Sequence, residues 1–222
     1  MNDIKKIGII GGSGALGSAL AHRLIQENFE VTIGSRSPEK VISKLGESDK
    51  DLGFQSLKVQ DIAQTASESE LIFLTVPFVA HQNTVQVIKP YVQGKIVVDT
   101  TVPLVPPKVA RVQLPDTGCV ARTTQEILGN DVHVVSALHN IAATALSRLE
   151  TPDGEVMVFG NSKEARETVI QLISKISLKG WHCGSIDNAV VAESLTPVLI
   201  FMNKFYNFKG SGIRIFDESM TQ

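Results

Sequence analysis

The sequence has 222 residues, 43% of them hydrophobic and 20% charged, a balance typical of a globular protein and not of a disordered chain. Its 21 lysines and arginines against 23 aspartates and glutamates give a net charge of −2, which argues against binding to nucleic acid or to an anionic membrane. Two cysteines cannot form a disulfide framework, no Cys/His cluster has metal-site spacing, and no apolar stretch is long enough to cross a bilayer. We therefore expect a cytoplasmic protein without a signal peptide and without a metal.

Short apolar runs alternate with segments of helical spacing from the N-terminus to about residue 150. The apolar runs predict strands at residues 6–10, 30–33, 57–59, 71–76, 95–99 and 134–138. The segments between them predict helices at 15–26, 38–46, after Asp61, 80–88 and 119–128; Ser37 is expected to cap the second and Gly46 to end it. This alternation favours an α/β fold with a doubly wound parallel sheet.

The pattern changes near residue 150, at the turn-rich segment 150–154. Beyond it we expect a strand at 156–159, a helix ending at Lys175, an extended piece at 180–184, an apolar helix at 189–203 and a last strand at 213–216. Asn161 and Glu164 have the spacing of a capping arrangement for the first of these helices. The predicted domains are residues 1–150 and a small C-terminal α/β lobe of residues 151–222 that closes the cleft.

A glycine-rich turn follows the first strand and opens the first helix. It matches G-x-G-x-x-G with Gly12, Ser13, Gly14, Ala15, Leu16 and Gly17. In this context backbone N–H groups and the helix N-terminus bind a pyrophosphate. The alternative is a turn without a ligand, but three glycines cost conformational entropy that a plain turn does not need. The motif predicts a Rossmann-type, dinucleotide-binding fold.

The residues after the second strand indicate which dinucleotide binds. An enzyme that uses NAD places Asp or Glu there against the ribose 2′-hydroxyl, whereas this sequence has Ser35 and Arg36, with Lys40 one helical turn past Pro38. A guanidinium binds a 2′-phosphate that a carboxylate repels. The two cations could instead be solvated surface charges, but their spacing from the glycine turn favours NADP(H).

The rest of the expected cleft is mostly apolar. Pro77 and Phe78 follow the fourth strand, and His139 follows the sixth. His139 is a candidate for a functional role, although a histidine at a strand end is more often structural. His81 and the other histidines have no partner spacing that suggests a metal or a triad, and no tyrosine–lysine pair has helical spacing. No catalytic acid or base is predicted, which suits a reaction that needs none.

Six segments of this sequence resemble the F420-dependent NADP reductases (NADPH:coenzyme F420 oxidoreductases). They are GGSGALG at 11–17, GSR at 34–36, TVPF at 75–78, KIVV at 95–98, VVSALH at 134–139 and AESLTP at 192–197. The resemblance covers nearly the whole chain, and the last two segments are the most specific. It implies reversible hydride transfer between NADP(H) and the 5-deazaflavin of coenzyme F420.

The resemblance also implies roles for particular residues. By it, residues 13–16 hold the pyrophosphate, residues 35, 36 and 40 hold the 2′-phosphate, and Phe78 and the segment near Ala143 border the nicotinamide and the deazaflavin. Family members carry an Ile-Pro step after the histidine that matches His139 and a tryptophan at position 78, where this sequence has Ile141-Ala142 and phenylalanine. Both departures lie where the deazaflavin is expected.

Other functions remain open on the sequence. An NADPH-dependent flavin or ferric reductase could use the same scaffold, and a regulator that senses NADP could bind the nucleotide without catalysis. A β-hydroxyacid or imine reductase usually has a longer helical second domain. The apolar run Val198–Met202 is either core or the contact face of a homodimer, and we expect a homodimer.

Overall fold

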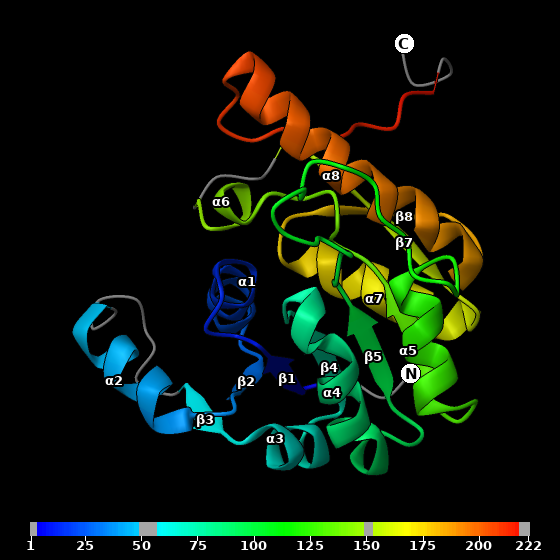
Figure 1. Ribbon diagram of the computed structural model, residues 1–222. Coiled ribbons are helices and arrows are strands. Elements are labelled where there is room, and N and C mark those ends of the chain that lie inside the picture. The colour runs from blue at the N-terminus through cyan, green and yellow to red at the C-terminus, as the bar shows by residue number, and fades with distance from the viewer. Residues whose placement is uncertain (1–3, 49–56, 149–152, 218–222) are drawn as a thin grey trace.

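The computed structural model describes residues 4–48, 57–148 and 153–217, which form one eight-stranded sheet with helices on both faces (Figure 1). The strand order is β3-β2-β1-β4-β5-β6-β7-β8. The strands are β1 Lys6–Ile10, β2 Glu30–Gly34, β3 Lys58–Gln60, β4 Leu71–Leu74, β5 Ile96–Asp99, β6 His133–Ser136, β7 Glu155–Gly160 and β8 Lys179–His182. Strands β1 to β6 are parallel, and the winding direction reverses between β1 and β4. The predicted Rossmann-type doubly wound sheet is confirmed.

Two layers of helices bury the sheet. The helices are α1 Ala15–Gln26, α2 Pro38–Ser48, α3 Ile62–Glu68, α4 Phe78–Ile88, α5 Val120–Leu128, α6 Ala143–Leu146, α7 Lys163–Lys175 and α8 Ala189–Tyr206, with short 3₁₀ turns η2 at Lys89–Tyr91 and η3 at Ile186–Asn188. One apolar core joins the sheet to α1, α6 and α7, and the other joins it to α3, α4, α5 and α8. No helix in the described part of the chain is long and apolar enough to span a membrane.

Strand β1 explains why the early strands read as continuous apolar runs. Ile7 and Ile9 pack in the core on the α1 side, and Ile10 packs in the core on the opposite side. Since both faces of a parallel sheet are covered by helices, residues on both sides of such a strand are buried, here all of β1 after Lys6. The boundaries of β1 and α1 agree with the prediction residue for residue.

The C-terminal segment extends the same sheet. Strand β7 pairs antiparallel with β6, and β8 pairs parallel with β7. The predicted boundary at residue 150 lies outside the described residues. The strand predicted at 213–216 is wrong: this segment has no strand pairing in the described part of the chain, and its backbone bonds to the first residue of β7, with Ile213 O accepting from Glu155 N and Ile215 N donating to the Glu155 carboxylate.

Helix ends were predicted with mixed success. Asp61 caps α3 as expected, accepting from Gln64 N. The cap of α7 is Ser162 and not Asn161, whose side chain accepts from Ile186 N instead. Two neighbouring residues could each cap this helix, and only the tertiary contact decides between them. The predicted stop at Gly46 is also wrong, because α2 continues to Ser48.

Arg23 of α1 fastens the glycine-turn helix to the chain that follows β6. Its buried guanidinium donates to Leu146 O at 2.6 Å, Ile176 O at 2.9 Å and Arg148 O at 2.6 Å. These carbonyls lie at the C-terminal ends of α6 and α7, where helix carbonyls have no partner within the helix. One buried cation therefore joins α1 to two segments that are more than a hundred residues away in sequence.

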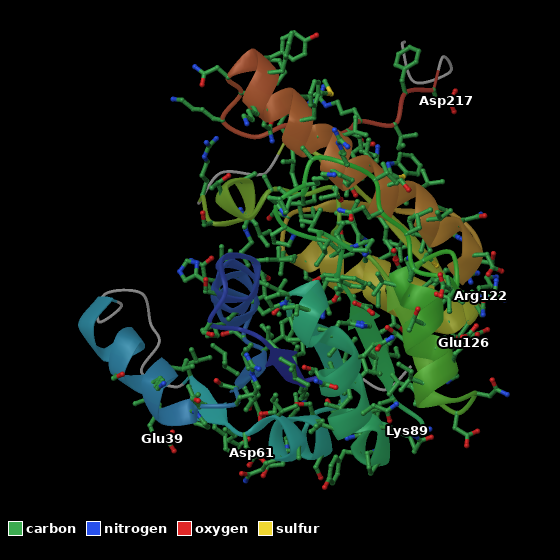
Figure 2. All side chains as sticks on the ribbon, viewed as in Figure 1. Glu39, Asp61, Lys89, Arg122, Glu126 and Asp217 are labelled. Carbon is green, nitrogen blue, oxygen red and sulfur yellow. The ribbon has the colours of Figure 1, made fainter. Side chains whose placement is uncertain are left out.

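We expect Arg23→Met to lower the free energy of unfolding by about 3 kcal/mol, because buried carbonyls lose a charged donor. Urea denaturation measures this change. The matched control is Arg122→Met on the outward face of α5 (Figure 2), where the arginine is half exposed and pairs with Glu126 and Asp187. The control should change the free energy by less than about 1 kcal/mol. Equal losses in the two variants would contradict the role of Arg23.

Candidate functional site

A cleft of about 740 Å³ opens at the carboxyl ends of β1, β2, β4 and β5. This is the switch point of the doubly wound sheet, where ligands bind in such folds. The cleft is lined by Gly11, Ser13–Leu16, Gly34–Ser37, Lys40, Val41, Ile62, Thr75–Phe78, Ala80, Thr84, Thr100–Val102 and Leu104. The structure therefore brings together residues from the ends of these strands that are as far apart along the chain as Gly11 and Leu104.

The glycine turn leaves the first amides of α1 open. Gly14 occupies the N-cap position and provides no side-chain hydrogen bond, so no side chain of the cap satisfies the first N–H groups of α1. Gly11 has a φ of 89°, in the left-handed region that favours glycine. Open amides at a helix N-terminus form a binding site for an anion.

Two of the predicted cofactor residues lie behind this turn and not in the cleft. A Cβ on Gly17 would lie 2.6 Å from Gly12 Cα and 2.7 Å from Thr75 Oγ1, and a Cβ on Gly12 would lie 2.8 Å from Ile33. Both glycines are buried. They permit α1 to pack closely against β1, β2 and β4, while Ser13, Gly14, Ala15 and Leu16 line the cleft.

The charged side chains of the cleft lie at one end. Arg36 and Lys40 are the only charged residues among the described residues that line it, and both are exposed to solvent. Ser35 lies beside them, and its Oγ accepts from Ser37 N at 3.1 Å. The two cations attract an anion to this end of the cleft. No carboxylate among the described residues of its lining could accept from the two ribose hydroxyls, as one does in proteins that bind NAD.

The other end of the cleft is small and uncharged. Helix α4 begins at Phe78, two residues earlier than predicted, with Pro77 at its N-cap position. Thr100 closes the facing wall, with its N and Oγ1 both donating to Leu74 O. Pro77 and Phe78 therefore stand opposite the loop that follows β5, and both line the cleft as the sequence predicts.

His139 and Ala143 lie outside this cleft. His139 is buried after β6, and burial lowers its pKa to about 4, so the imidazole is neutral at pH 7. The residues between and after them border a second cavity of about 190 Å³, which is lined by Asn140–Ala142, Ala145, Arg148, Asp153, Gly154 and Gly210–Gly212. These two of the thirteen predicted residues therefore line neither the cleft nor the second cavity, although their neighbours in sequence line the second.

Comparisons with known proteins agree with this geometry. The family described as "NADP oxidoreductase coenzyme F420-dependent" matches residues 6–103. The F420-dependent NADP reductase of Methanocaldococcus jannaschii is 34% identical over 219 residues, which cover 95% of this chain and 97% of the relative. The chain belongs to the F420-dependent NADP reductase family.

Further matches fit this family assignment. The F420-dependent NADP reductase of Methanothermobacter marburgensis is 33% identical over 218 residues, covering 95% of this chain and 97% of that protein. A crystal structure from Arthrobacter sp. FB24, assigned to the F420-dependent NADP reductases, superposes with a TM-score of 0.79 and covers 96% of this chain and 99% of that one. At 23% identity this structure supports the fold alone.

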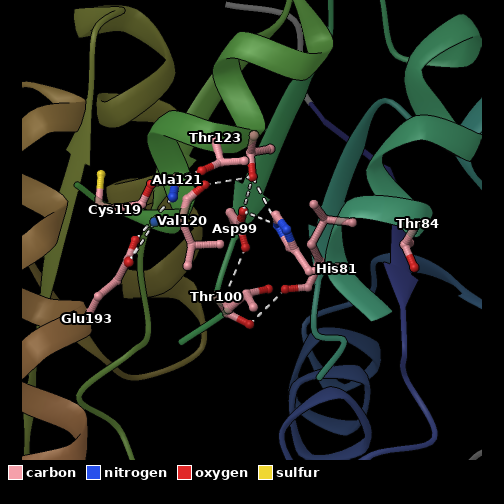
Figure 3. Close-up of polar contacts among 12 residues, drawn as sticks. His81, Thr84, Asp99, Thr100, Cys119, Val120, Ala121, Thr123 and Glu193 are labelled. Carbon is pink, nitrogen blue, oxygen red and sulfur yellow. Dashed lines mark hydrogen bonds and ion pairs between the residues drawn. The ribbon is translucent and has the colours of Figure 1, made fainter. Parts of the chain in front are cut away.

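The sequence analysis missed a cluster of buried polar side chains behind the uncharged end of the cleft (Figure 3). His81 Nε2 lies 2.8 Å from Asp99 Oδ2, and the Thr124 hydroxyl donates to the same carboxylate oxygen. The three residues come from α4, β5 and α5, so no sequence spacing links them. The one available signal was an aspartate that ends the apolar strand Ile96–Asp99.

Glu193 of α8 is a second buried carboxyl in this region (Figure 3). Its oxygens accept from Val120 N at 2.7 Å and Ala121 N at 3.1 Å, at the N-terminus of α5. Burial raises the pKa of Glu193 to about 7, although the two backbone donors oppose the rise. In the described residues no group of three or more His, Cys, Asp or Glu side chains could hold a metal ion.

The raised pKa of Glu193 predicts a loss of stability with increasing pH. Between pH 4.5 and about 7 the unfolded chain has lost this proton while the folded chain still holds it. We expect the free energy of unfolding of wild type, relative to Glu193→Gln, to fall by about 3 kcal/mol across this window. Urea denaturation at pH 4.5 and 8 measures the difference. The difference between wild type and Glu126→Gln, at an exposed position of α5, should hardly change with pH. A difference between wild type and Glu193→Gln that stays the same at pH 4.5 and pH 8 would contradict the assignment.

Proposed function

We propose that this chain transfers a hydride between NADP(H) and the 5-deazaflavin of coenzyme F420. The observation that carries the proposal is the division of the cleft into a cationic end at Arg36 and Lys40 and an uncharged end at Thr75–Phe78 and Thr100–Leu104. A dinucleotide with a phosphate on its adenosine ribose and an uncharged amide on its nicotinamide has the same division. Membership of the F420-dependent NADP reductase family supports coenzyme F420 as the second substrate.

The phosphates of NADP(H) would be held by two groups of residues. Ser13, Gly14, Ala15 and Leu16 present the open amides of the turn and of α1 to the pyrophosphate. Ser35, Arg36 and Lys40 would hold the 2′-phosphate by charge-assisted hydrogen bonds. Gly12 and Gly17 contribute by allowing the turn to pack closely against β2 and β4.

The uncharged end of the cleft would hold the nicotinamide. The nicotinamide of NADPH would give a hydride to the deazaflavin, whose reduced ring would also take up one proton, from solvent; in the reverse direction the hydride would return to NADP⁺ and the proton to solvent. The described residues of this end of the cleft would therefore orient the rings and would not carry a proton. Pro77, Phe78 and Thr100 form walls that exclude water and orient the ring. His139 and Ala143 would flank the deazaflavin from the side of the second cavity, where a neutral imidazole adds no charge.

We also propose that residues 151–222 act as the lobe that closes the site. The second cavity supports this because the chain before residue 150 and the chain after it both line it: Ile141 and Ala145 on one side, Gly154 and Gly210 on the other. Cys119 and Cys183 are both free, which fits a reducing compartment such as the cytoplasm.

The choice between NADPH and NADH tests the cationic end of the cleft. Arg36→Ala should weaken NADPH binding about 10- to 100-fold (~1.5–3 kcal/mol) and leave NADH binding nearly unchanged, because only NADPH carries the 2′-phosphate. Dissociation constants from calorimetry measure both. Arg122→Ala, on the outward face of α5, is the control and should change neither. Equal losses for the two nucleotides would remove Arg36 from the proposed site.

The acceptor is tested by turnover. Purified protein with NADPH should reduce F420 at a rate at least tenfold above its rate with FMN or FAD. The loss of NADPH absorbance measures each rate. Faster turnover with flavins or ferric chelates would indicate a flavin or ferric reductase. Tight NADPH binding without turnover of any acceptor would indicate a sensor of the nucleotide.

An aromatic patch supports the proposed homodimer. The rings of Phe201, Phe205, Tyr206 and Phe208 contact one another in that order at the end of α8, stacked except for the edge-to-face pair Phe205–Tyr206. Neighbouring ring centroids are 4.9 to 5.8 Å apart, and Phe205 is 69% exposed. Contiguous exposed apolar surface of this kind marks an interface.

We expect light scattering to give the mass of a dimer for wild type and of a monomer for Phe205→Glu. Val79→Glu, at an exposed apolar position of α4 that is 91% exposed, is the control and should stay dimeric. A wild-type monomer would exclude the homodimer.

A further inference from the structure

The carboxylate of Asp99 connects the walls of the uncharged end of the cleft. Its Oδ2 lies 2.8 Å from His81 Nε2 of α4 and accepts from the Thr124 hydroxyl of α5. Its Oδ1 accepts from the backbone N–H of Thr101, in the loop that follows β5, at 2.9 Å. Figure 3 shows Asp99 between His81 and α5. One buried side chain therefore fixes α4, α5 and this loop relative to one another.

Burial of the Asp99 carboxylate costs desolvation free energy. Asp99, His81 and Thr124 have no exposed surface, and Asp99 ends a strand whose other residues are Ile96, Val97 and Val98. Although burial opposes ionisation, the His81 charge and the hydrogen bonds lower the pKa of Asp99 to about 2. Replacement of a buried ion pair by apolar side chains is often neutral or stabilising. Stability alone therefore gives a weak reason for an ion pair at this position.

The groups that Asp99 holds are next to residues of the cleft. Thr100, Thr101 and Val102 follow Asp99 directly and line the cleft. On the other side, Ala80 and Thr84 flank His81 on α4 and also line it. Thr101 is 3% exposed, and its hydroxyl has no hydrogen-bond partner among the described residues. A small shift of the Asp99 carboxylate would therefore move both walls.

We propose that Asp99, through His81, Thr124 and the Thr101 amide, is a positioning residue for the nicotinamide end of NADP(H). The inference rests on the proposed use of NADP(H). Asp99 itself does not line the cleft. It keeps the first turns of α4 and the loop after β5 at the separation that holds the ring, while the phosphates are bound independently at the other end of the cleft.

Two substitutions separate this role from a purely stabilising one. Asp99→Asn keeps the shape of the side chain but removes its charge and replaces one acceptor oxygen by a donor nitrogen. Thr124→Val removes only the hydroxyl that donates to Asp99, and Thr124→Ser retains a hydroxyl. Ser69→Ala is the matched control, because the Ser69 hydroxyl is buried and donates to Thr65 O at 2.7 Å, but lies before β4, at the opposite end of the sheet from the cleft.

The readouts distinguish the two ends of the dinucleotide. Adenosine 2′,5′-bisphosphate carries the adenosine phosphates without nicotinamide, and the fluorescence of bound NADPH reports the surroundings of the reduced ring. We expect Asp99→Asn and Thr124→Val to bind the bisphosphate within twofold of wild type. Their bound-NADPH emission should differ from wild type, and kcat with F420 should fall at least tenfold while KM for NADPH changes less than threefold. Thr124→Ser and Ser69→Ala should behave as wild type.

Several results would overturn the inference. Wild-type emission spectra and wild-type kcat in folded Asp99→Asn or Thr124→Val protein, even with a lower Tm, would leave Asp99 a stabilising residue only. If Asp99→Asn does not fold, the emission spectrum and kcat of Thr124→Val alone test the role of Asp99. If wild type binds NADPH but reduces no F420, the proposed function fails while the emission spectra still test the role of Asp99. If wild type binds no NADPH, both fail.

Discussion

The site depends on the close packing of the glycine turn against the sheet. Gly17 approaches Gly12 and Thr75 so closely that a single methyl group at position 17 would overlap both. This contact brings the first turn of α1 directly over the carboxyl ends of β1 and β4. Because Gly14 offers no capping side chain, the amides of that turn stay available to a ligand. The position of the cleft follows from this steric constraint, and its open amides follow from the glycine at the cap position.

The sheet topology then decides which residues share the cleft. The chain reverses its direction of winding between β1 and β4, so the ends of β2 and of β4 lie on opposite sides of the turn. Arg36 and Lys40 follow β2, and Phe78 follows β4. The cationic and uncharged ends of the cleft are thus separated by the fold itself, and a dinucleotide can lie across the turn with its phosphates between them.

The sequence predicts what is local and misses what is tertiary. Strand β1, helix α1 and the glycine turn were predicted because their signals lie within twenty residues of one another. Arg36 and Lys40 could be assigned to the same cleft because their distance from that turn is fixed in a β-α-β unit. The cap of α7 and the end of α2 were wrong because Ser162 and Asn161 compete equally on sequence, and a glycine in a helix is tolerated when packing supports the helix.

The buried network of His81, Asp99 and Thr124 could not have been found this way. His81 lies 18 residues before Asp99 and Thr124 lies 25 residues after it, on helices that only the folded sheet brings together. The same is true of Glu193, which reaches α5 from α8. An aspartate at the end of an apolar strand indicates that a partner must exist, since an unpaired buried carboxylate is too costly, but it does not indicate which residue the partner is.

Two buried ionisable side chains, Arg23 and Glu193, attach the C-terminal segment to the half of the chain that precedes it, one on each face of the sheet. Arg23 of α1 binds carbonyls that follow α6 and α7 on one face, and Glu193 of α8 binds the N-terminus of α5 on the other. The pairing of β7 with β6 holds the same segment within the sheet. Attachment on both faces fixes the second cavity relative to the cleft. Hydride transfer requires reacting carbons held about 3–3.5 Å apart. Among the described residues that line the uncharged end of the cleft, none has an acidic or basic side chain, so for the proposed hydride transfer this fixed geometry is the contribution that the fold makes.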